Sequence, residues 1–226
     1  MGRQDREGRE IDLMRLYPKP GNRMAERPTI TDEDREISRR FDVDYFDGDR
    51  RHGYGGFGYH PRFWTDTVDL FVNHYELGPD AAILDVGCAK GFMLKDLRHR
   101  LPHARLAGID ISTYAIEHAD PEVAGLVSIA NAIELPFEDD SFDLVISINT
   151  LHNLHREDCA RAFAEVQRVT RNHAFVMVDG WKNEEERILL EQWVLTAYTM
   201  LSADDWIALM RGAGYTGDYC FWNPLS

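Results

Sequence analysis

A glycine-containing turn and the acidic residue that follows it are the part of the sequence best suited to chemistry. The run from Asp85 to Gly91, DVGCAKG, stands between an apolar segment typical of a buried strand and a segment with helical spacing. Glycines in such a turn let the backbone bend tightly and approach a ligand at the N-terminus of the next helix. Asp110 ends the following apolar segment, where a carboxylate accepts hydrogen bonds from a ribose. The pair predicts a site for a nucleotide-like cofactor.

The segments around this turn alternate between strand-like and helix-like patterns. Apolar runs typical of buried strands span residues 81–87, 105–111, 125–131, 142–150, 173–181 and 214–222. Amphipathic segments with helical spacing span residues 63–75, 92–101, 113–119, 159–170, 183–197 and 204–212. Apolar strands that alternate with amphipathic helices indicate βαβ units with both faces of the sheet covered. We therefore expect a doubly wound α/β fold with a mostly parallel central sheet.

The N-terminal quarter of the chain has a different composition. Residues 1–30 are charged and contain three prolines, which favours either an arm lying over the domain or a partly disordered tail. Thr31, with Asp34 three residues on, predicts the start of a short helix that ends near Arg40. We expect residues 1–61 to form an N-terminal arm and lid, and residues 62–226 to form the cofactor-binding domain.

Net charge and cysteine content limit the partners. The formal net charge is −14, with 39 acidic and 25 basic residues, which would repel a nucleic-acid backbone or an anionic membrane. The N-terminus has no apolar signal segment, and no apolar run reaches the roughly 20 residues of a membrane span, so a cytoplasmic location is expected. Cys88, Cys159 and Cys220 lack the spacing of zinc ligands, which predicts reduced thiols and no metal site.

Four motifs in order resemble the class I S-adenosylmethionine (SAM) dependent methyltransferases, in particular the type 11 group. They are ILDVGCAKG (83–91), GIDIS (108–112), ANAIELPFEDDSFDLVISINTLHNL (130–154) and HAFVMVDGW (173–181). The resemblance covers residues from about 62 to 223 and implies SAM as the cofactor. A nicotinamide-dependent oxidoreductase has a similar first turn and is the alternative, but the string LPFEDDSFDLV is typical of the methyltransferases.

The resemblance also assigns residues to the cofactor. Asp85 and Gly87 would border the methionine moiety, together with Cys88 and Gly91 of the same turn and Asn149 after the fourth strand. The adenosine would contact four further residues, Asp110 at the ribose, Ile111 at the adenine face, and Asn131 and Ala132 at the adenine edge. Two positions depart from the family, which usually has glycine at Ala89 and aspartate at Asn131. An amide still accepts from the adenine amino group and donates to a ring nitrogen.

The methyl acceptor is expected beside the ends of the fourth and fifth strands. His152 is the first choice for a general base, since imidazole titrates near neutral pH and the nearby Asn149 and Asn153 are able to orient a polar acceptor. Alternatively, His152 caps the strand or packs against the cofactor. Asp179 either binds a cationic or hydroxylated acceptor, or caps a helix in contact with solvent. His155 is expected to start a helix at the surface.

Residues 45–64, which we call the glycine-aromatic segment, contain a stretch in which the glycines at positions 53, 55, 56 and 58 are interleaved with tyrosine and phenylalanine. Glycine permits positive φ, and aromatic rings supply rigid contact area. The segment is either a lid, with Tyr54, Phe57 and Tyr59 as walls that exclude water, or a cover for the sheet edge. Arg62 is either a bidentate partner of the SAM carboxylate or an exposed arginine.

These observations predict an enzyme that transfers a methyl group from SAM to an O or N atom of a small polar metabolite. Two alternatives stay open, namely a non-catalytic SAM-binding sensor or scaffold and an enzyme that moves another group. A homodimer is compatible with the sequence. The sequence does not name the acceptor.

Overall fold

The computed structural model describes residues 7–19 and 29–224, and within them a seven-stranded sheet has the order β3-β2-β1-β4-β5-β6, with β7 also paired to β5. The strands are β1 (Ala82–Val86), β2 (Arg105–Asp110), β3 (Val127–Ile129), β4 (Phe142–Ile148), β5 (Thr170–Trp181), β6 (Leu201–Ser202) and β7 (Asp218–Trp222). The pairings between these strands are parallel. The chain runs from β1 to β2 and β3 on one side and then crosses to β4 on the other, so the topological switch point lies between the carboxyl ends of β1 and β4.

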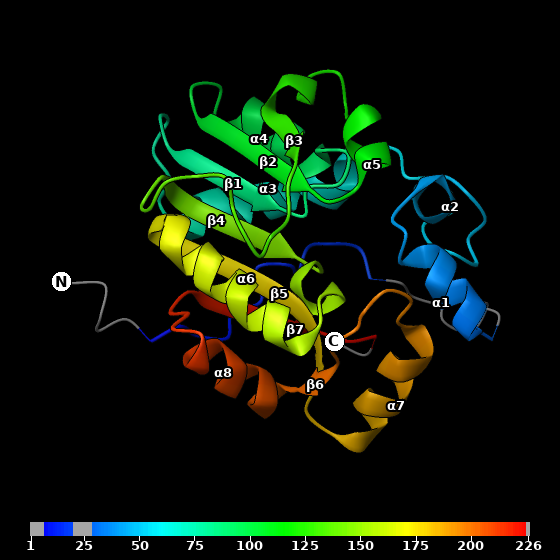
Figure 1. Cartoon of the computed structure of the whole chain (residues 1–226). Coiled ribbons are helices and arrows are strands. Elements are labelled where there is room, and N and C mark those ends of the chain that lie inside the picture. The colour runs from blue at the N-terminus through cyan, green and yellow to red at the C-terminus, as the bar shows by residue number, and fades with distance from the viewer. Residues whose placement is uncertain (1–6, 20–28, 225–226) are drawn as a thin grey trace.

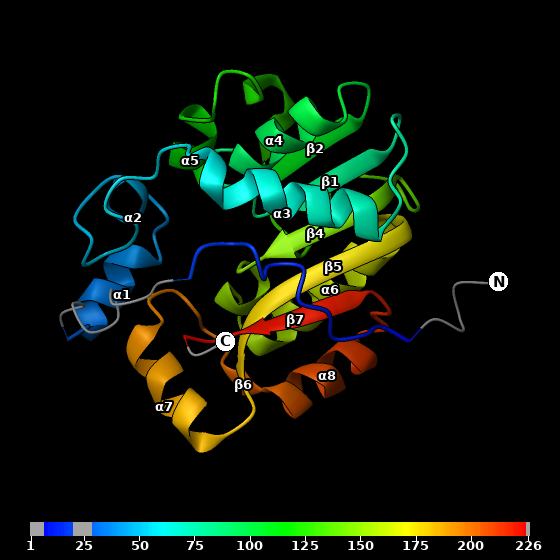
Figure 2. The ribbon, with the colours of Figure 1, turned by 180° about the vertical axis from the view of Figure 1, so that it is seen from behind.

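Helices cover both faces of the sheet, as the opposite views of Figures 1 and 2 show. On one face lie α3 (Pro61–His74) and α4 (Phe92–Arg100), and on the other lie α6 (Arg156–Val169) and α8 (Ala203–Gly212). Two shorter helices lie near the sheet edges and strand ends, namely α5 (Thr113–Glu117) and α7 (Glu184–Trp193). Short 3-10 turns, η3 (Ala124–Leu126) and η4 (Leu151–Asn153), precede β3 and follow β4. The doubly wound α/β fold expected from the sequence is confirmed.

The central strands are apolar because helices cover both of their faces. All five residues of β1 are buried. Successive side chains alternate, so Ile83 packs into the layer with α3 and α4 while Leu84 packs into the layer with α6 and α8. Full burial of such a side chain stabilises the fold by roughly 1.5–3 kcal/mol. This packing holds the strand ends, where the site residues stand, in fixed positions.

The largest difference from the predicted elements follows β5. The helix expected over residues 183–197 ends at Trp193, because Val194 takes an extended conformation with φ −71° and ψ 130°. The backbone N–H groups of Tyr198 and Thr199 then donate to the carbonyl oxygen of His152, at 3.1 and 3.0 Å. Tertiary hydrogen bonds to η4 thus replace the helical ones that the apolar spacing predicted. The strand β6 and the helix α2 (Val43–Phe46) were not predicted.

The arm, defined here as residues 7–19, lies over the domain, and the dark-blue chain in Figure 2 runs beside β7. The Ile11 N–H donates to the Tyr219 carbonyl oxygen at 2.8 Å, and the Tyr219 N–H donates to the Arg9 carbonyl oxygen at 3.0 Å. Leu13 is only 2% exposed and belongs to the core layer of α3 and α4. Of the two alternatives for the N-terminus, the covering arm therefore holds for residues 7–19, whereas residues 1–6 and 20–28 lie outside the described part.

The helix α1 (Asp32–Ser38) begins as predicted at Thr31, which forms a capping box with Asp34. Just after this helix, Arg39 donates to the backbone carbonyl oxygens of Thr196 and Ala197, at 3.3 and 2.9 Å. These bonds attach α1 to the connection between α7 and β6. In both ribbon views, α1 and α2 stand beyond the carboxyl ends of the strands.

The glycine-aromatic segment is fastened to the turn after β1. Lys90, which belongs to this turn, donates to the Asp47 carboxylate at 2.5 Å and to the Phe57 carbonyl oxygen at 3.1 Å. Gly55 and Gly56 have φ values of 69° and 108°, which residues with a side chain rarely adopt. The glycines thus let the segment fold back over the domain.

Candidate functional site

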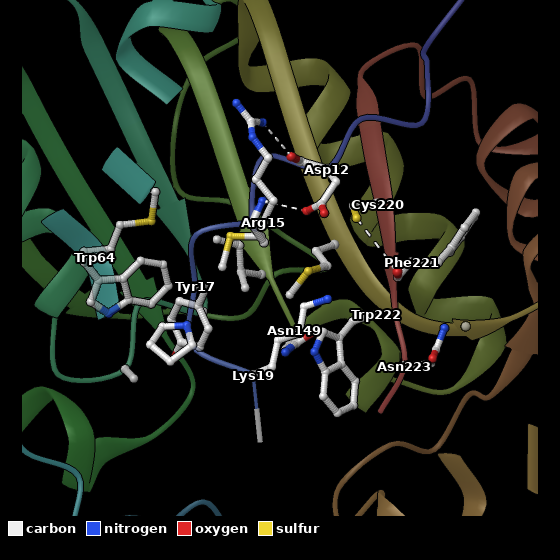
Figure 3. Close-up of a pocket in the computed structure, with 18 of the residues that line it drawn as sticks. Asp12, Arg15, Tyr17, Lys19, Trp64, Asn149, Cys220, Phe221, Trp222 and Asn223 are labelled. Atoms are coloured by element: carbon white, nitrogen blue, oxygen red, sulfur yellow. Dashed lines mark hydrogen bonds between the residues drawn. The ribbon is translucent and has the colours of Figure 1, made fainter. Parts of the chain in front are cut away.

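A cavity of about 350 Å³ lies at the carboxyl ends of β1, β4 and β5, and such a volume suits a small ligand. The arm forms one wall, and Figure 3 shows its Asp12, Arg15, Tyr17 and Lys19 around the opening. Of the residues singled out from the sequence for the site, seven line the cavity, namely Tyr54, Phe57, Asp85, Gly87, Cys88, Asn149 and, as the departure from the family pattern, Ala89. The cavity coincides with the topological switch point, where ligands bind in open α/β sheets.

The turn after β1 depends on two unusual backbone conformations. Gly87 has φ 85°, and a Cβ atom at this position would lie 1.9 Å from Oγ1 of Thr150. A side chain here would therefore collide with the residue that follows β4. Gly91, the N-cap of α4, has φ 78°. Ala89 adopts φ 48° without being a glycine, which costs roughly 1 kcal/mol or more.

Asp85 is a carboxyl group without a partner on the cavity wall. It is 5% exposed, and within the described residues its side chain forms no hydrogen bond or ion pair. Burial, with the charge of Asp110 adding, raises the pKa of Asp85 to about 7. A buried carboxylate is stabilised by a cation or by hydrogen-bond donors. The ammonium group of a methionine moiety would supply both, so the residues of this wall fit SAM.

Asp110, in contrast, is already hydrogen-bonded by its own chain. Its carboxylate accepts from the backbone N–H groups of Ala89 and Ser112, both at 2.8 Å. Burial raises the pKa of Asp110, while the bonds from Ser112 and Ala89 oppose that rise. The carboxylate is thus held at the end of β2, where the ribose is expected, and each of its oxygens keeps a second lone pair for an additional donor.

The other residues assigned to adenosine surround the ends of β2 and β3 outside the cavity. Ile111 is 55% exposed, which leaves an apolar side chain free to cover an adenine ring. Asn131 is exposed, and its Oδ1 accepts from the Ile133 N–H at 3.2 Å, while Ala132 is buried. The assignments of these three residues stay predictions.

His152 and Asp179 meet at the ends of β4 and β5. Nδ1 of His152 accepts the backbone N–H of Asp179 at 2.9 Å, so the proton of the neutral ring is on Nε2, which lies 3.6 Å from Oδ2 of Asp179. Burial lowers the pKa of His152 to about 3 and raises the pKa of Asp179 to about 8. The Nδ1 lone pair of His152 thus accepts a backbone N–H and Nε2 carries the ring proton, so neither nitrogen has a free lone pair, which does not favour the predicted role of general base.

The three aromatic residues predicted to form a wall are separated. Tyr54 and Phe57 line the cavity, and the Phe57 ring stacks on Phe92 with 5.0 Å between centroids. The Tyr59 hydroxyl instead donates to Asp96 at 2.6 Å, which anchors the segment to α4. The lid role of the segment stays a prediction.

Arg62 lies away from the cavity. It is exposed on the first turn of α3, and its guanidinium stacks over the Phe63 ring at 4.8 Å. The structure does not bring it to the turn after β1. His155 is the N-cap of α6, as predicted.

Sequence reasoning missed the walls that come from the two ends of the chain. The arm and residues 220–223 line much of the cavity, and Lys182 lies on its wall in an ion pair with Glu10 at 2.5 Å. No local pattern marks these residues, because they meet only through tertiary packing. Within the described part of the chain, no group of three or more His, Cys, Asp or Glu residues is arranged to hold a metal ion. Residues 7–19 and 29–224 also contain no helix long and apolar enough to cross a bilayer.

Comparisons with known proteins indicate the family of the chain. A family model described as a methyltransferase domain matches residues 84–178. An uncharacterized protein of Haemophilus influenzae is 31% identical over 163 residues, which are 66% of this chain and 64% of that protein. A tRNA (carboxymethyluridine(34)-5-O)-methyltransferase of Arabidopsis thaliana is 33% identical over 131 residues, 56% of this chain and 30% of that protein. The chain thus spans less than two thirds of the length of either relative.

The solved structure of YcgJ from Bacillus subtilis has a TM-score of 0.52 at 21% identity and covers 65% of this chain and 66% of that chain, which shows a common fold. The fold and the cavity at its switch point define an α/β protein that binds a nucleotide-like cofactor. The matching family model and relatives support the class I SAM-dependent methyltransferase family, whose methyltransferase domain matches residues 84–178. SAM, and not a nicotinamide nucleotide, is the cofactor that this family implies.

Proposed function

We propose that this chain transfers a methyl group from SAM to an O or N atom of a small polar molecule in the cytoplasm. The observation that carries the proposal is the unpaired carboxyl of Asp85, which is 5% exposed on the wall of a cavity at the end of β1. A buried carboxyl without a donor in its own chain is a binding site for a cationic ligand.

When bound, SAM supplies a methyl group on a sulfonium, which is already a strong electrophile. The chain therefore has to align the acceptor and exclude water. We assign Asp85, Gly87 and Cys88 to the methionine moiety and Asp110 to the ribose. Asn149, at the end of β4 and on the cavity wall, would lie between cofactor and acceptor.

On the acceptor side we assign Tyr54 to the wall, Asp179 to proton exchange and His152 to the positioning of Asp179. His152 holds the Asp179 backbone through its Nδ1, and the Trp206 indole N–H donates to the Asp179 carbonyl oxygen at 2.8 Å. Two side chains thus fix this residue from opposite sides. Such pre-positioning is what a proton-transfer group needs.

The small size of the acceptor follows from the walls of the cavity. The arm and the glycine-aromatic segment both lie over the carboxyl ends of the strands, where a macromolecular substrate would need an open groove. One relative acts on tRNA, so a nucleic-acid acceptor is the outcome that would correct this part of the proposal. The net charge of −14 opposes such a partner.

The test has two stages. In a thermal-shift assay, SAM and S-adenosylhomocysteine should stabilise the chain and NAD should not, and a ligand at 100 times its dissociation constant adds roughly 2.7 kcal/mol. Methyl-labelled SAM is then incubated with a polar metabolite extract and, separately, with total RNA. Label in a small molecule supports the proposal, and label in RNA corrects the acceptor class. SAM binding without transfer to either would indicate a non-catalytic SAM-binding protein.

A further inference from the structure

The carboxyl of Asp179 is the most unusual polar group on the acceptor side. It is 6% exposed, and within the described residues it accepts no hydrogen bond. Its nearest recorded polar side-chain neighbour, Nε2 of His152, is 3.6 Å away, which is too long for a hydrogen bond. Its backbone is nevertheless fixed by β5, His152 and Trp206. A rigidly held carboxyl without a donor among the described residues is suited to accept hydrogen bonds from a ligand.

A second acceptor atom without a donor lies on the neighbouring turn η4. Oδ1 of Asn153 is buried and has no hydrogen-bond partner among the described residues. The amide nitrogen of the same side chain donates to the carbonyl oxygen of Asn149, a residue of the cavity wall, at 3.2 Å. Leaving such an atom unpaired costs about 1–3 kcal/mol. A ligand with several N–H or O–H donors would therefore be favoured beside η4.

Two tyrosines of the glycine-aromatic segment belong to the same end of the sheet. The rings of Tyr45 and Tyr54 contact each other with 5.2 Å between centroids, and Tyr54, which is 45% exposed, lines the cavity. Burial raises the pKa of Tyr45, and the charges of Asp110 and Asp179 add to the rise.

The connection between α7 and β6, residues 194–200, is fixed beside η4. The His152 carbonyl oxygen accepts from the N–H groups of Tyr198 and Thr199, and Arg39 donates to the carbonyl oxygens of Thr196 and Ala197. Thr196 and Thr199 are 7% and 5% exposed. The segment next to His152 is therefore held in place by hydrogen bonds.

We propose that the methyl acceptor is an amine, whose protonated nitrogen pairs with the Asp179 carboxylate between the two tyrosines and the ends of β4 and β5. This inference rests on the proposed function and deepens it by naming the acceptor class. An ammonium suits the site better than a hydroxyl for two reasons. Its charge compensates a buried carboxylate, and a charge-assisted hydrogen bond is roughly twice as strong as a neutral one. Aromatic rings also attract cations.

The reaction balances without any other reactant. The ammonium gives one proton to the Asp179 carboxylate, and the lone pair set free on nitrogen forms the new N–CH₃ bond while the C–S bond of the sulfonium breaks. The products are a protonated N-methylamine, neutral S-adenosylhomocysteine and the carboxylic acid of Asp179. The pKa of Asp179, which burial raises to about 8, lies nearer to that of an alkylammonium than an ordinary carboxyl does. The titratable groups recorded around Asp179 are His152 on η4 and Tyr45 and Tyr54 on the glycine-aromatic segment.

The experiment blocks amines selectively. A polar metabolite extract of the organism that encodes the chain is divided, and one half is treated with acetic anhydride in neutral water, which acetylates primary and secondary amines and leaves hydroxyls. Both halves are incubated with the full chain and SAM carrying a deuterated methyl group. We expect a labelled product in the untreated half, a loss of at least about tenfold after acetylation, and a deuterated methylamine fragment in its mass spectrum.

Variants connect the product to the site. Asp179→Asn should lower labelling by about 10²-fold or more while S-adenosylhomocysteine binds within about twofold of the wild type. Asp158→Asn, on the outer surface of α6, is the matched control. It should change neither the labelling nor the affinity for S-adenosylhomocysteine. A labelled O-methyl product, or labelling that survives acetylation, overturns the amine. Full labelling by Asp179→Asn overturns the role of Asp179. SAM binding without any labelled product instead rejects the catalytic part of the proposed function.

Discussion

Asp110 and Asp179 are both carboxylates at the ends of strands, yet their surroundings differ in kind. The carboxylate of Asp110 accepts two backbone N–H groups at 2.8 Å, whereas the carboxylate of Asp179 accepts none from the described residues. The backbone of Asp179 is as firmly held as that of Asp110, because His152 and Trp206 bind its N–H and carbonyl groups. The chain thus satisfies the carboxylate of Asp110 with its own backbone and leaves the carboxylate of Asp179 to be satisfied by a ligand.

The largest expected effect is a loss of methyl-transfer rate at Asp179 without a loss of cofactor binding, which would distinguish Asp179 from Asp110. Asp179→Asn should reduce the rate of methyl transfer by about 10²- to 10⁴-fold, since the amide keeps the shape and loses the proton acceptor. Binding of S-adenosylhomocysteine, measured by calorimetry, should not change. A variant that keeps its rate would show that Asp179 only fills space beside His152.

The same substitution should change the pH dependence of stability. The pKa of Asp179 rises from 3.8 in the unfolded chain to about 8 in the fold, so between these values the folded state binds more protons. Stability should therefore fall as pH rises from about 4 to 8. Asp179→Asn removes this loss of stability. Relative to the wild type, the variant should therefore gain more unfolding free energy at pH 8.5 than at pH 5. Urea titrations at both pH values measure the difference, and an equal gain at both would contradict the raised pKa.

The second effect concerns the cofactor side. Asp110→Ala should weaken S-adenosylhomocysteine binding by about 10- to 100-fold, because hydrogen bonds to a charged group contribute about 1.5–3 kcal/mol. It also removes the acceptor of the Ala89 and Ser112 N–H groups, so Asp110→Asn, which retains one acceptor oxygen, serves as the comparison. Unchanged affinity in both folded variants would remove Asp110 from the cofactor site.

A smaller loss of rate is expected when His152 is replaced. The size of that loss decides whether Asp179 or His152 is the general base. If Asp179 exchanges the proton, His152→Ala should lower the rate by roughly tenfold through loss of alignment, and the rate should still rise with pH. If His152 is the base, as the sequence first suggested, the loss should be about 10²- to 10⁴-fold and the pH dependence should disappear. Initial rates between pH 6 and 9.5 distinguish the two outcomes.

The sequence predicts those parts of the structure that depend on local interactions, and it fails where residues distant in the sequence interact. Apolar periodicity predicted the strands around Asp85, Asp110 and Asp179, because two covered faces require it. It failed after Trp193, where hydrogen bonds from residues 198 and 199 to His152 override helical spacing. Local pattern therefore located the strands and their carboxyl ends.

The walls of the site could not be predicted, because they too depend on contacts between residues far apart in the sequence. The arm meets the cavity only after pairing with β7, some two hundred residues further along the chain, and no local motif encodes that pairing. Arg62 has the right chemistry for a carboxylate, but the direction of α3 turns its side chain away, onto Phe63. The structure was also needed to see that Nδ1 of His152 accepts the Asp179 backbone N–H, which leaves the ring proton on Nε2.

The smallest expected effect tests whether the cofactor side stores strain. Ala89 holds Asp110 through its N–H while adopting φ 48°, a conformation that costs an L residue roughly 1–2 kcal/mol. Ala89→Gly removes this cost but adds about 0.4–1 kcal/mol of unfolded-state entropy. The net gain in unfolding free energy should be about 0.5–1 kcal/mol, a rise of a few degrees in Tm. Affinity for S-adenosylhomocysteine should stay within about twofold, since the N–H donor remains.

Glu76→Gly is the matched control, because Glu76 has φ 50° at the end of α3, outside the cavity lining. It should show a similar gain in Tm and no change in affinity. If Ala89→Gly weakens binding by more than about tenfold while Glu76→Gly does not, the methyl group of Ala89 contacts the cofactor. The departure from the family's glycine would then be a binding feature of this chain. Equal behaviour of both variants would instead mean that Ala89 is tolerated as ordinary strain, and that the hydrogen bonds to Asp110 alone prepare the cofactor side.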